Sequence, residues 1–343
     1  MKNTRVNEID LLRFLAALAV VFFHLAFRGH AADDLSVLSY PWLEPVAKYG
    51  YLGVDLFFMI SGFVILMTAQ QGSLRAFVVS RLVRLYPAFW VCCTFTFLCT
   101  LAWGGARFQV TWPQYLVNMT MLSEFMGVPP VDGVYWSLFV ELRFYALVAL
   151  VLVLGAIRHA QWLAAGWLAT CIALEFVPVR GLPTLLISDY AAYFVAGATC
   201  YLIWQRGWSW ARGGMVLGAW ALALHQSLHR MADLAQHYHV DMDARIVGGL
   251  VTAGFATLVA VACRATGALR HKRWAALGAL TYPLYLLHQN ISFMAFNHLA
   301  TAFDVHLLFW GVIGACVALA HGVHRYPESW IARAMKAVLQ PQR

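Results

Sequence analysis

Residues 50–70 read G-Y-L-G-V-D-L-F-F-M-I-S-G-F-V-I-L-M-T-A-Q, an apolar run in which Asp55 is the only charged residue. A helix of about 20 apolar residues crosses the roughly 30 Å of hydrocarbon in a bilayer. Similar runs recur along the chain and predict ten transmembrane helices, near residues 9–27, 50–70, 85–104, 134–155, 162–179, 185–204, 214–229, 245–263, 274–297 and 304–324. Two further stretches, 111–126 and 328–340, are predicted as interfacial helices.

The composition excludes a soluble globular protein. Hydrophobic residues make up 62% of the chain and charged residues 12%, against about 45–50% and about 25% in soluble domains. The net charge of +8 is spread over short segments between apolar runs, so nucleic acid is not the expected partner. We predict an all-α polytopic membrane helix bundle that forms a single domain over residues 1–343, without internal repeats.

Basic residues indicate the orientation of this bundle. We count 16 of the 24 Lys and Arg residues at the termini and in the even-numbered loops, including Lys2 and Arg343, and 6 in the odd-numbered loops. Positive charge accumulates on the cytoplasmic side of membrane proteins. Both termini are therefore predicted to be cytoplasmic, and the protein is expected in the cell (inner) membrane.

Cysteines and histidines give no sign of a metal. The seven cysteines lie in or at the ends of apolar stretches and form no C-x-x-C pair, so neither a disulfide framework nor a zinc site is indicated. Four histidines between residues 225 and 239 have no carboxylate cluster of defined geometry beside them. We expect no bound metal.

Ionisable residues inside apolar runs are costly and are candidates for function. The first predicted helix carries Asp10, Arg13 and His24. Arg13 and His24 are 11 residues apart, which corresponds to about 1100° of helix rotation, so they share one face roughly 16 Å apart along the axis. Arg13 would lie near the cytoplasm and His24 nearer the outside.

The other candidates divide by depth in the same way. Arg81 and Arg84 precede the third span on its cytoplasmic side, whereas Asp55, Glu141 and His288 lie toward the outer side. Arginines suit phosphate binding, and histidine suits acid–base chemistry on a hydroxyl. A ligand with a phosphorylated head and an arm of about 15–20 Å would join both ends, and coenzyme A has this shape.

Structural roles remain open for each candidate. His24 could bond a neighbouring carbonyl, Arg13 could pair with Asp10, and Arg81 and Arg84 could only anchor the cytoplasmic side. Asp55 and Glu141 could form structural pairs, and His288 could be a packing residue. Ser61, beside Gly62, is predicted to allow close helix contact and not to act as a nucleophile.

Five motifs, in order, resemble the acyltransferase 3 family of membrane O-acyltransferases. They are I-D-L-L-R-F-L-A-A-L-A-V-V-F-F-H (9–24), with the family's R-x10-H pair; G-Y-L-G-V-D-L-F-F-M-I-S-G-F (50–63); R-L-V-R-L-Y-P (81–87); W-S-L-F-V-E-L-R-F-Y (136–145); and L-T-Y-P-L-Y-L-L-H (280–288), in which Thr281 stands where the family often has serine. Each motif is weak alone, but five in order over about 280 residues are specific.

The resemblance implies an enzyme that moves an acyl group, acetyl in the first instance, from cytoplasmic acyl-CoA to a hydroxyl of a carbohydrate or another surface or secreted acceptor. It implies that Arg13, Arg81 and Arg84 bind the coenzyme A phosphates and that His24 is the base, with Asp55, Glu141 and His288 in the same site. Many family members carry an SGNH hydrolase-like domain after the membrane part; here we expect the membrane domain only. The alternative function is a secondary transporter or flippase, which would also explain intramembrane charges.

Overall fold

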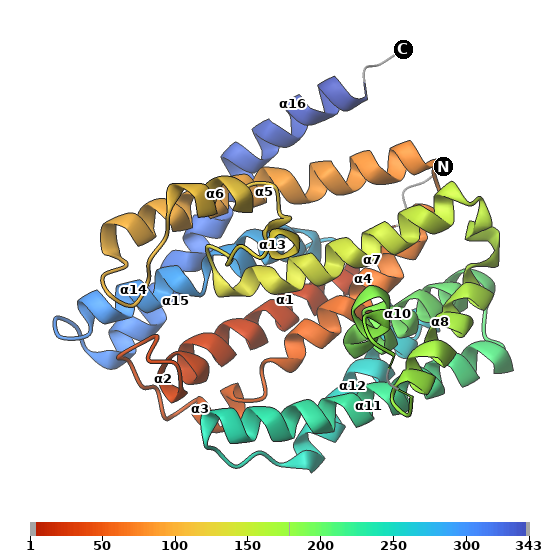
Figure 1. Cartoon of the computed structure of the whole chain (residues 1–343), viewed down its shortest axis with the longest axis horizontal. Coiled ribbons are helices and arrows are strands. Elements are labelled where there is room, and N and C mark those ends of the chain that lie inside the picture. Colours follow the sequence, from red (N-terminus) through yellow and green to blue (C-terminus); the bar gives the residue numbers. More distant parts are fainter. Residues whose placement is uncertain (1–4, 178, 341–343) are drawn as a thin grey trace. The chain divides into compact units, whose positions relative to one another are not determined.

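The computed structural model describes residues 5–177 and 179–340, and this part of the chain consists of helices and connecting loops with no strand (Figure 1). At least one helix overlaps each of the ten predicted segments. The all-α helix bundle is therefore confirmed. Lys2 and Arg343 from the charge count, and Pro178 in the segment 162–179, lie outside the described residues.

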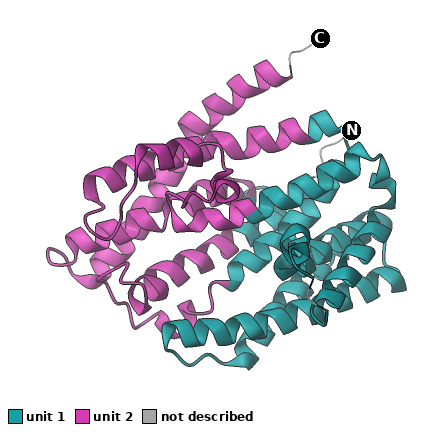
Figure 2. Cartoon of the chain, viewed as in Figure 1, with its two compact units in different colours: residues 1–13, 52–77, 140–274 teal, residues 14–51, 78–139, 275–343 magenta. Residues whose placement is uncertain are grey.

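The chain divides into two compact units whose segments alternate along the sequence (Figure 2). Unit 1 comprises residues 1–13, 52–77 and 140–274, and unit 2 comprises residues 14–51, 78–139 and 275–343. Each unit is described below by itself.

Unit 1 is built around α10 (Ser188–Arg206), which is buried at every position from Ala191 to Ile203. Its other helices are α4 (Leu52–Ala69), most of α7 (Trp136–Val153), α8 (Ala160–Leu174), α9 (Leu182–Leu186), α11 (Trp210–Tyr238) and α12 (Ala244–Ala262), with single turns η4 (Ala156–His159) and η5 (Gly267–Leu269). Phe194 of α10 packs between Phe58 of α4 and Phe144 of α7, with ring centroids 5.0 Å and 4.2 Å away.

Small residues bring α4 and α10 into backbone contact. A Cβ atom on Gly62 would collide with the carbonyl oxygen of Phe194, and one on Gly197 would collide with the carbonyl oxygen of Met59. Glycine is the residue that permits such an approach between membrane helices. The close helix contact predicted at Ser61 is found at its neighbour Gly62.

Unit 2 contains most of α1 (Asn7–Phe23), which continues into a π-helical turn η1 (His24–Arg28) and α2 (Gly29–Ala31). Most of α5 (Leu74–Trp103) also belongs to it, followed by α6 (Trp112–Asn118), η2 (Ser123–Met126) and η3 (Gly133–Tyr135). The remaining helices are α3 (Glu44–Ala47), α13 (Trp274–Leu287), α14 (Asn290–Leu299), α15 (Val305–Val323), the π-helical turn η6 (His324–Glu328) and α16 (Ser329–Leu339).

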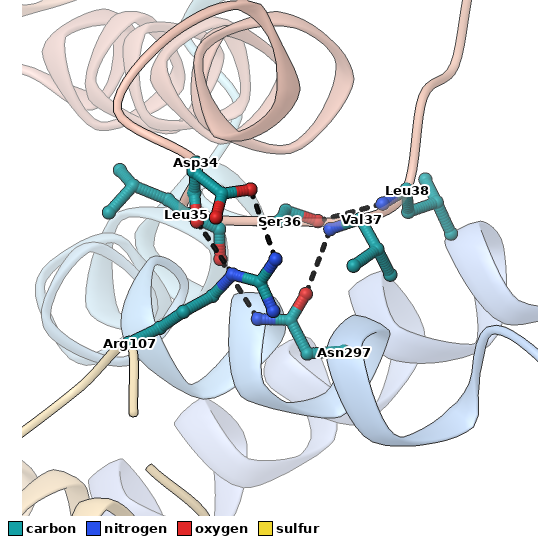
Figure 3. Close-up of polar contacts among 7 residues, drawn as sticks. All are labelled: Asp34, Leu35, Ser36, Val37, Leu38, Arg107 and Asn297. Atoms are coloured by element: carbon teal, nitrogen blue, oxygen red, sulfur yellow. Dashed lines mark hydrogen bonds and ion pairs between the residues drawn. The ribbon is translucent and has the colours of Figure 1, made fainter. Parts of the chain in front are cut away.

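The loop that follows α2 is tied to two distant segments of unit 2 (Figure 3). Arg107 donates to the backbone oxygen and the carboxylate of Asp34, at 2.8 Å and 3.0 Å. Asn297 of α14 donates to the carbonyl of Leu35 and accepts the N–H of Val37. These contacts hold the chain in place directly after the α1–η1–α2 helix.

Seven helical stretches of the described residues are long and apolar enough to cross a membrane: Asn7–Ala31, Leu52–Ala69, Leu74–Trp103, Gly133–Val153, Leu182–Arg206, Ala244–Ala262 and Val305–Leu339. Of the other three predicted spans, α8 and α13 are short, with 15 and 14 residues, and α11 is long but more polar. The count of ten spans and the cytoplasmic termini therefore stay predictions.

One predicted helix is interrupted. The segment 274–297 is not a single helix, because α13 ends at Leu287 and α14 begins at Asn290. The two residues between them are His288 and Gln289, and Gln289 has a non-helical backbone conformation with φ −84° and ψ −80°. This break lies at one of the candidate site residues.

Candidate active site

His24 stands where the first helix changes its winding. The α-helical hydrogen bonding of α1 ends at Phe23, and His24 begins the π-helical turn η1. Such wide turns are rare and are frequent at functional sites, because they re-aim the side chains that follow. His24 is 7% exposed, and the ring of Phe23 packs edge-on against its imidazole, with 5.2 Å between the ring centroids.

His288 is held at the break between α13 and α14. It is fully buried, and its Nδ1 lies 2.8 Å from the carbonyl oxygen of Tyr285. Pro283, inside α13, lacks the N–H that a regular helix would use. The two neighbours that follow His288, Gln289 and Asn290, are also buried.

The two histidines meet within unit 2. Nε2 of His288 lies 2.9 Å from Nδ1 of His24, and the ring centroids are 4.9 Å apart. The predicted site residues His24 and His288 are thus brought together, although 264 positions separate them in the chain.

Neighbouring carbonyls determine the tautomer of each ring. A carbonyl oxygen only accepts, so Nδ1 of His288 must donate to Tyr285. In a neutral ring Nε2 of His288 is then an acceptor, and it accepts from Nδ1 of His24, which also lies 3.0 Å from the carbonyl of Val20. The bond from His24 to a nearby carbonyl is therefore present together with the histidine pair. Because the proton of the neutral His24 ring is then on Nδ1, Nε2 of His24 keeps its lone pair, as a general base requires.

Asp132 is a buried residue beside this pair that the sequence analysis missed. It is 0% exposed, and its carboxylate accepts hydrogen bonds from Gln289 and from the backbone N–H of Asn290, at 3.2 Å and 3.1 Å. Burial raises the pKa of Asp132 to about 6, against the lowering effect of the backbone N–H groups of Asn290 and Val134 and of the Arg28 charge. No apolar pattern or known motif marked Asp132, because it lies in the loop before the predicted span 134–155.

Asp55 belongs to unit 1, where it forms an ion pair. Arg230 of α11 donates to both carboxylate oxygens, at 3.0 Å and 3.1 Å, and the Asp55 side chain is 4% exposed. The Tyr193 hydroxyl, which lies 3.4 Å from Arg230, is bonded to Ser227 at 2.6 Å. Structural pairing, one of the two roles open for Asp55, is thus present, and a role in catalysis stays a prediction.

Glu141 also lies in unit 1 and is bonded to Ser61. The Ser61 hydroxyl donates to Oε1 of Glu141 at 2.6 Å. Arg143, two positions further along α7, donates to the carbonyl of Thr184 at 2.9 Å. Ser61 serves as the hydrogen-bond partner of an acidic side chain.

The three arginines expected at coenzyme A are all partly exposed. Arg81 donates to the hydroxyl of Ser80, and the Arg84 guanidinium lies 6.0 Å from the ring centre of Tyr282, both in unit 2. Arg13 lies in the part of α1 that belongs to unit 1, near Asp10, which accepts from Arg5 at 2.6 Å. Binding of coenzyme A phosphates by these three arginines stays a prediction.

The family described as "Acyltransferase domain" matches residues 6–323, nearly the whole chain. The chain belongs to this acyltransferase family. The match includes every candidate residue named above, and it favours an enzyme over the transporter alternative.

Two of three similar proteins are named as acyltransferases. The chain is 27% identical to nodulation protein 10 of Rhizobium leguminosarum bv. viciae, over 65% of this chain and 66% of that protein. It is 29% identical to the acyltransferase MdmB of Streptomyces mycarofaciens, over 50% of this chain and 46% of that protein. It is also 29% identical to the peptidoglycan O-acetyltransferase OatA of Listeria monocytogenes, over 41% of this chain and 23% of that protein.

This chain spans about two thirds of the length of nodulation protein 10 and smaller parts of the other two proteins. A comparison with solved structures gives no significant match.

Proposed function

We propose that this protein is a membrane-bound O-acyltransferase that moves an acyl group, acetyl in the first instance, from cytoplasmic acyl-CoA to a hydroxyl of a carbohydrate acceptor. Family membership supports the acyl transfer. The peptidoglycan O-acetyltransferase among the relatives supports a hydroxyl of a surface glycan as the acceptor. The apolar helices support a single acyltransferase domain embedded in the cell (inner) membrane.

The histidine pair is the observation that carries the proposal. Its hydrogen bonds leave Nε2 of His24 as a free base inside a largely buried site. His288 holds the His24 ring by accepting from Nδ1, as the orienting residue does in nucleophile–base arrangements.

The reaction uses this lone pair. The acceptor hydroxyl gives its proton to Nε2 of His24 while its oxygen attacks the thioester carbonyl. The carbon–sulfur bond then breaks, and coenzyme A leaves as a thiolate that takes up the proton, so that an ester and a free thiol are formed. A two-step route, in which Nε2 itself first accepts the acyl group, needs the same lone pair.

The other candidates have supporting roles in this proposal. Arg13, Arg81 and Arg84 bind the coenzyme A phosphates from the cytoplasmic side, since guanidinium groups form paired hydrogen bonds with phosphate. Glu141, with the Ser61 hydroxyl, is proposed to bind the acceptor or to orient the catalytic histidine. Asp55 is proposed in the same role, although its ion pair with Arg230 makes it the candidate most in need of a test.

The first experiment measures free thiol released from acetyl-CoA by the protein purified into liposomes, with and without a glycan acceptor. Wild type is compared with His24→Ala and, as a matched control, with His271→Ala, which changes an exposed histidine in a loop of unit 1. We expect His24→Ala to lose about 10²–10⁴-fold in kcat, as general bases do, and His271→Ala to keep wild-type activity. Equal activity in all three proteins would remove His24 from the mechanism.

A further inference from the structure

The break between α13 and α14 places a backbone N–H group inside unit 2 without a partner in its own helix. Helix ends leave backbone N–H groups without intrahelical partners, and Asn290 begins α14 while being only 9% exposed. A buried N–H without an acceptor destabilises the fold, because it has lost its hydrogen bond to water. Oδ2 of Asp132 supplies this acceptor at 3.1 Å.

Gln289 is fixed at both ends of its side-chain amide. Its Oε1 accepts from Arg28 at 2.8 Å, and its Nε2 donates to Oδ1 of Asp132 at 3.2 Å. An oxygen facing the guanidinium and an N–H facing the carboxylate is the only assignment of this amide that satisfies both partners.

The segment 288–290 also contacts the backbone of the loop that carries Asp132. Asn290 donates through Nδ2 to the carbonyl of Val131 at 3.1 Å. A Cβ atom on Gly133 would lie only 2.6 Å from Nε2 of Gln289. The loop 131–134 and the segment 288–290 therefore fit together without spare room, and we call this set of contacts the Asp132 clamp.

The fully buried carboxylate of Asp132 is compensated by hydrogen-bond donors from two segments of the chain. Burying a charge destabilises the fold unless hydrogen bonds compensate it, and an apolar residue in this loop would avoid the cost. The donors of Asp132 come from Val134 in its own loop and from Gln289 and Asn290, the two residues that follow His288. The carboxylate thus acts on the segment that carries the second histidine of the site.

We propose that Asp132 and Gln289 are positioning residues for acyl transfer, which hold the segment 288–290 so that Nε2 of His288 stays within hydrogen-bond distance of Nδ1 of His24. The proposal rests on the proposed function. It extends the site from two histidines to a connected set in which Arg28, Gln289 and Asp132 set the place of His288, and His288 sets the orientation of His24.

Two variants disturb the clamp in different ways. Asp132→Asn keeps one acceptor oxygen but puts an NH₂ group where Asn290 needs an acceptor. Gly133→Ala removes no polar atom but pushes the Gln289 amide aside. We expect both to lower kcat for thiol release from acetyl-CoA by about 10- to 100-fold, since small misplacements of reacting groups have effects of this size, with KM for acetyl-CoA unchanged. Ser292→Ala is the matched control, because Ser292 is buried in α14 but bonds Cys316 outside the clamp.

A double-mutant cycle separates positioning from general structural damage. If Asp132 acts through His288, adding Asp132→Asn to His288→Ala should lower kcat no further, because coupled residues are non-additive. Independent losses that multiply in the double variant, or a wild-type kcat in both clamp variants, would overturn the proposal.

Hydrogen exchange measured by mass spectrometry gives a readout without activity. We expect the peptide around residues 286–293 to exchange at least about 10-fold faster in Asp132→Asn than in wild type, because one net hydrogen bond to a charged group is lost. Unchanged exchange would refute the clamp whatever the activity. Wild-type protein that releases no thiol would instead refute the proposed function, and the exchange data would still decide whether Asp132 holds the segment.

Discussion

His24 at the end of α1 and His288 at the start of a helix break share a hydrogen bond of 2.9 Å inside unit 2. The bond is directional, because the carbonyls of Tyr285 and Val20 require the Nδ1 atoms of both rings to be donors. This arrangement supports the proposed roles, with His24 as the base and His288 as the acceptor that orients it.

Substitution of His288 should therefore be milder than substitution of His24. We expect His288→Ala to lower kcat for thiol release by about 10–100-fold, since only the orientation of the base is lost. His288→Gln should recover part of this, because a side-chain carbonyl can still accept from Nδ1 of His24. Equal losses in the alanine variants of both histidines would instead indicate that His288 takes part in the proton transfer itself.

The ion pair of Asp55 with Arg230 predicts strong coupling in stability. Arg230→Ala leaves a buried carboxylate without its partner and should lower the free energy of unfolding in detergent by about 3–5 kcal/mol. The double variant Asp55→Asn/Arg230→Gln should be close to wild type in stability, since it removes both charges. Thiol release by this double variant then tests the catalytic role of Asp55: normal activity would assign Asp55 to structure alone.

Close packing of α4 on α10 predicts a large effect from one methyl group. Gly62→Ala places a Cβ against the carbonyl of Phe194, a backbone atom that cannot move aside on its own. We expect a loss of about 1–3 kcal/mol in unfolding free energy, the usual range for overpacking. Gly166→Ala, where a Cβ meets nothing within 4 Å, is the control and should be neutral or slightly stabilising in its helix.

Coenzyme A binding should depend on the arginines that precede Pro87. We expect Arg81→Ala and Arg84→Ala each to raise KM for acetyl-CoA by roughly 10–100-fold with little change in kcat, as loss of a charged hydrogen bond to phosphate does. Arg333→Ala, in helix α16, which has no buried residue, serves as a control for the loss of a positive charge elsewhere. Isothermal titration with coenzyme A gives the same comparison without turnover, and equal affinities across the variants would leave these arginines as charge anchors.

Asp132 predicts a pH-dependent stability difference. Its pKa is raised by burial to about 6 in the folded protein, so the folded state binds the proton more readily than the unfolded state does. The ionised carboxylate therefore costs stability, fully so above about pH 6, and this cost is relieved progressively as the pH falls from 6 toward the ordinary carboxyl pKa. Relative to Asp132→Asn, wild type should gain about 1 kcal/mol of unfolding free energy between pH 7 and pH 5. A parallel pH dependence in the two proteins would contradict this assignment.

Much of the architecture follows from the sequence alone. Apolar runs of about 20 residues, such as 50–70, must form helices in a bilayer because every backbone polar group needs an internal partner there. The ordered motifs identified the family, and their intramembrane charges singled out His24, His288, Asp55 and Glu141. These apolar runs, motifs and ionisable residues can be recognised from the local sequence, without knowing which residues they contact in the fold.

The partners themselves were decided by the tertiary structure. Neither the pairing of His24 with His288 nor that of Asp55 with Arg230 has a sequence signature, because their separations of 264 and 175 residues follow no helical period. The break at His288–Gln289 was missed because nothing at those two positions forbids a helix. It persists because Asp132, from a distant loop, satisfies the amide that the break exposes. Buried polar groups must be satisfied wherever the fold supplies a partner, so the sequence can nominate such groups but only packing determines what they bond.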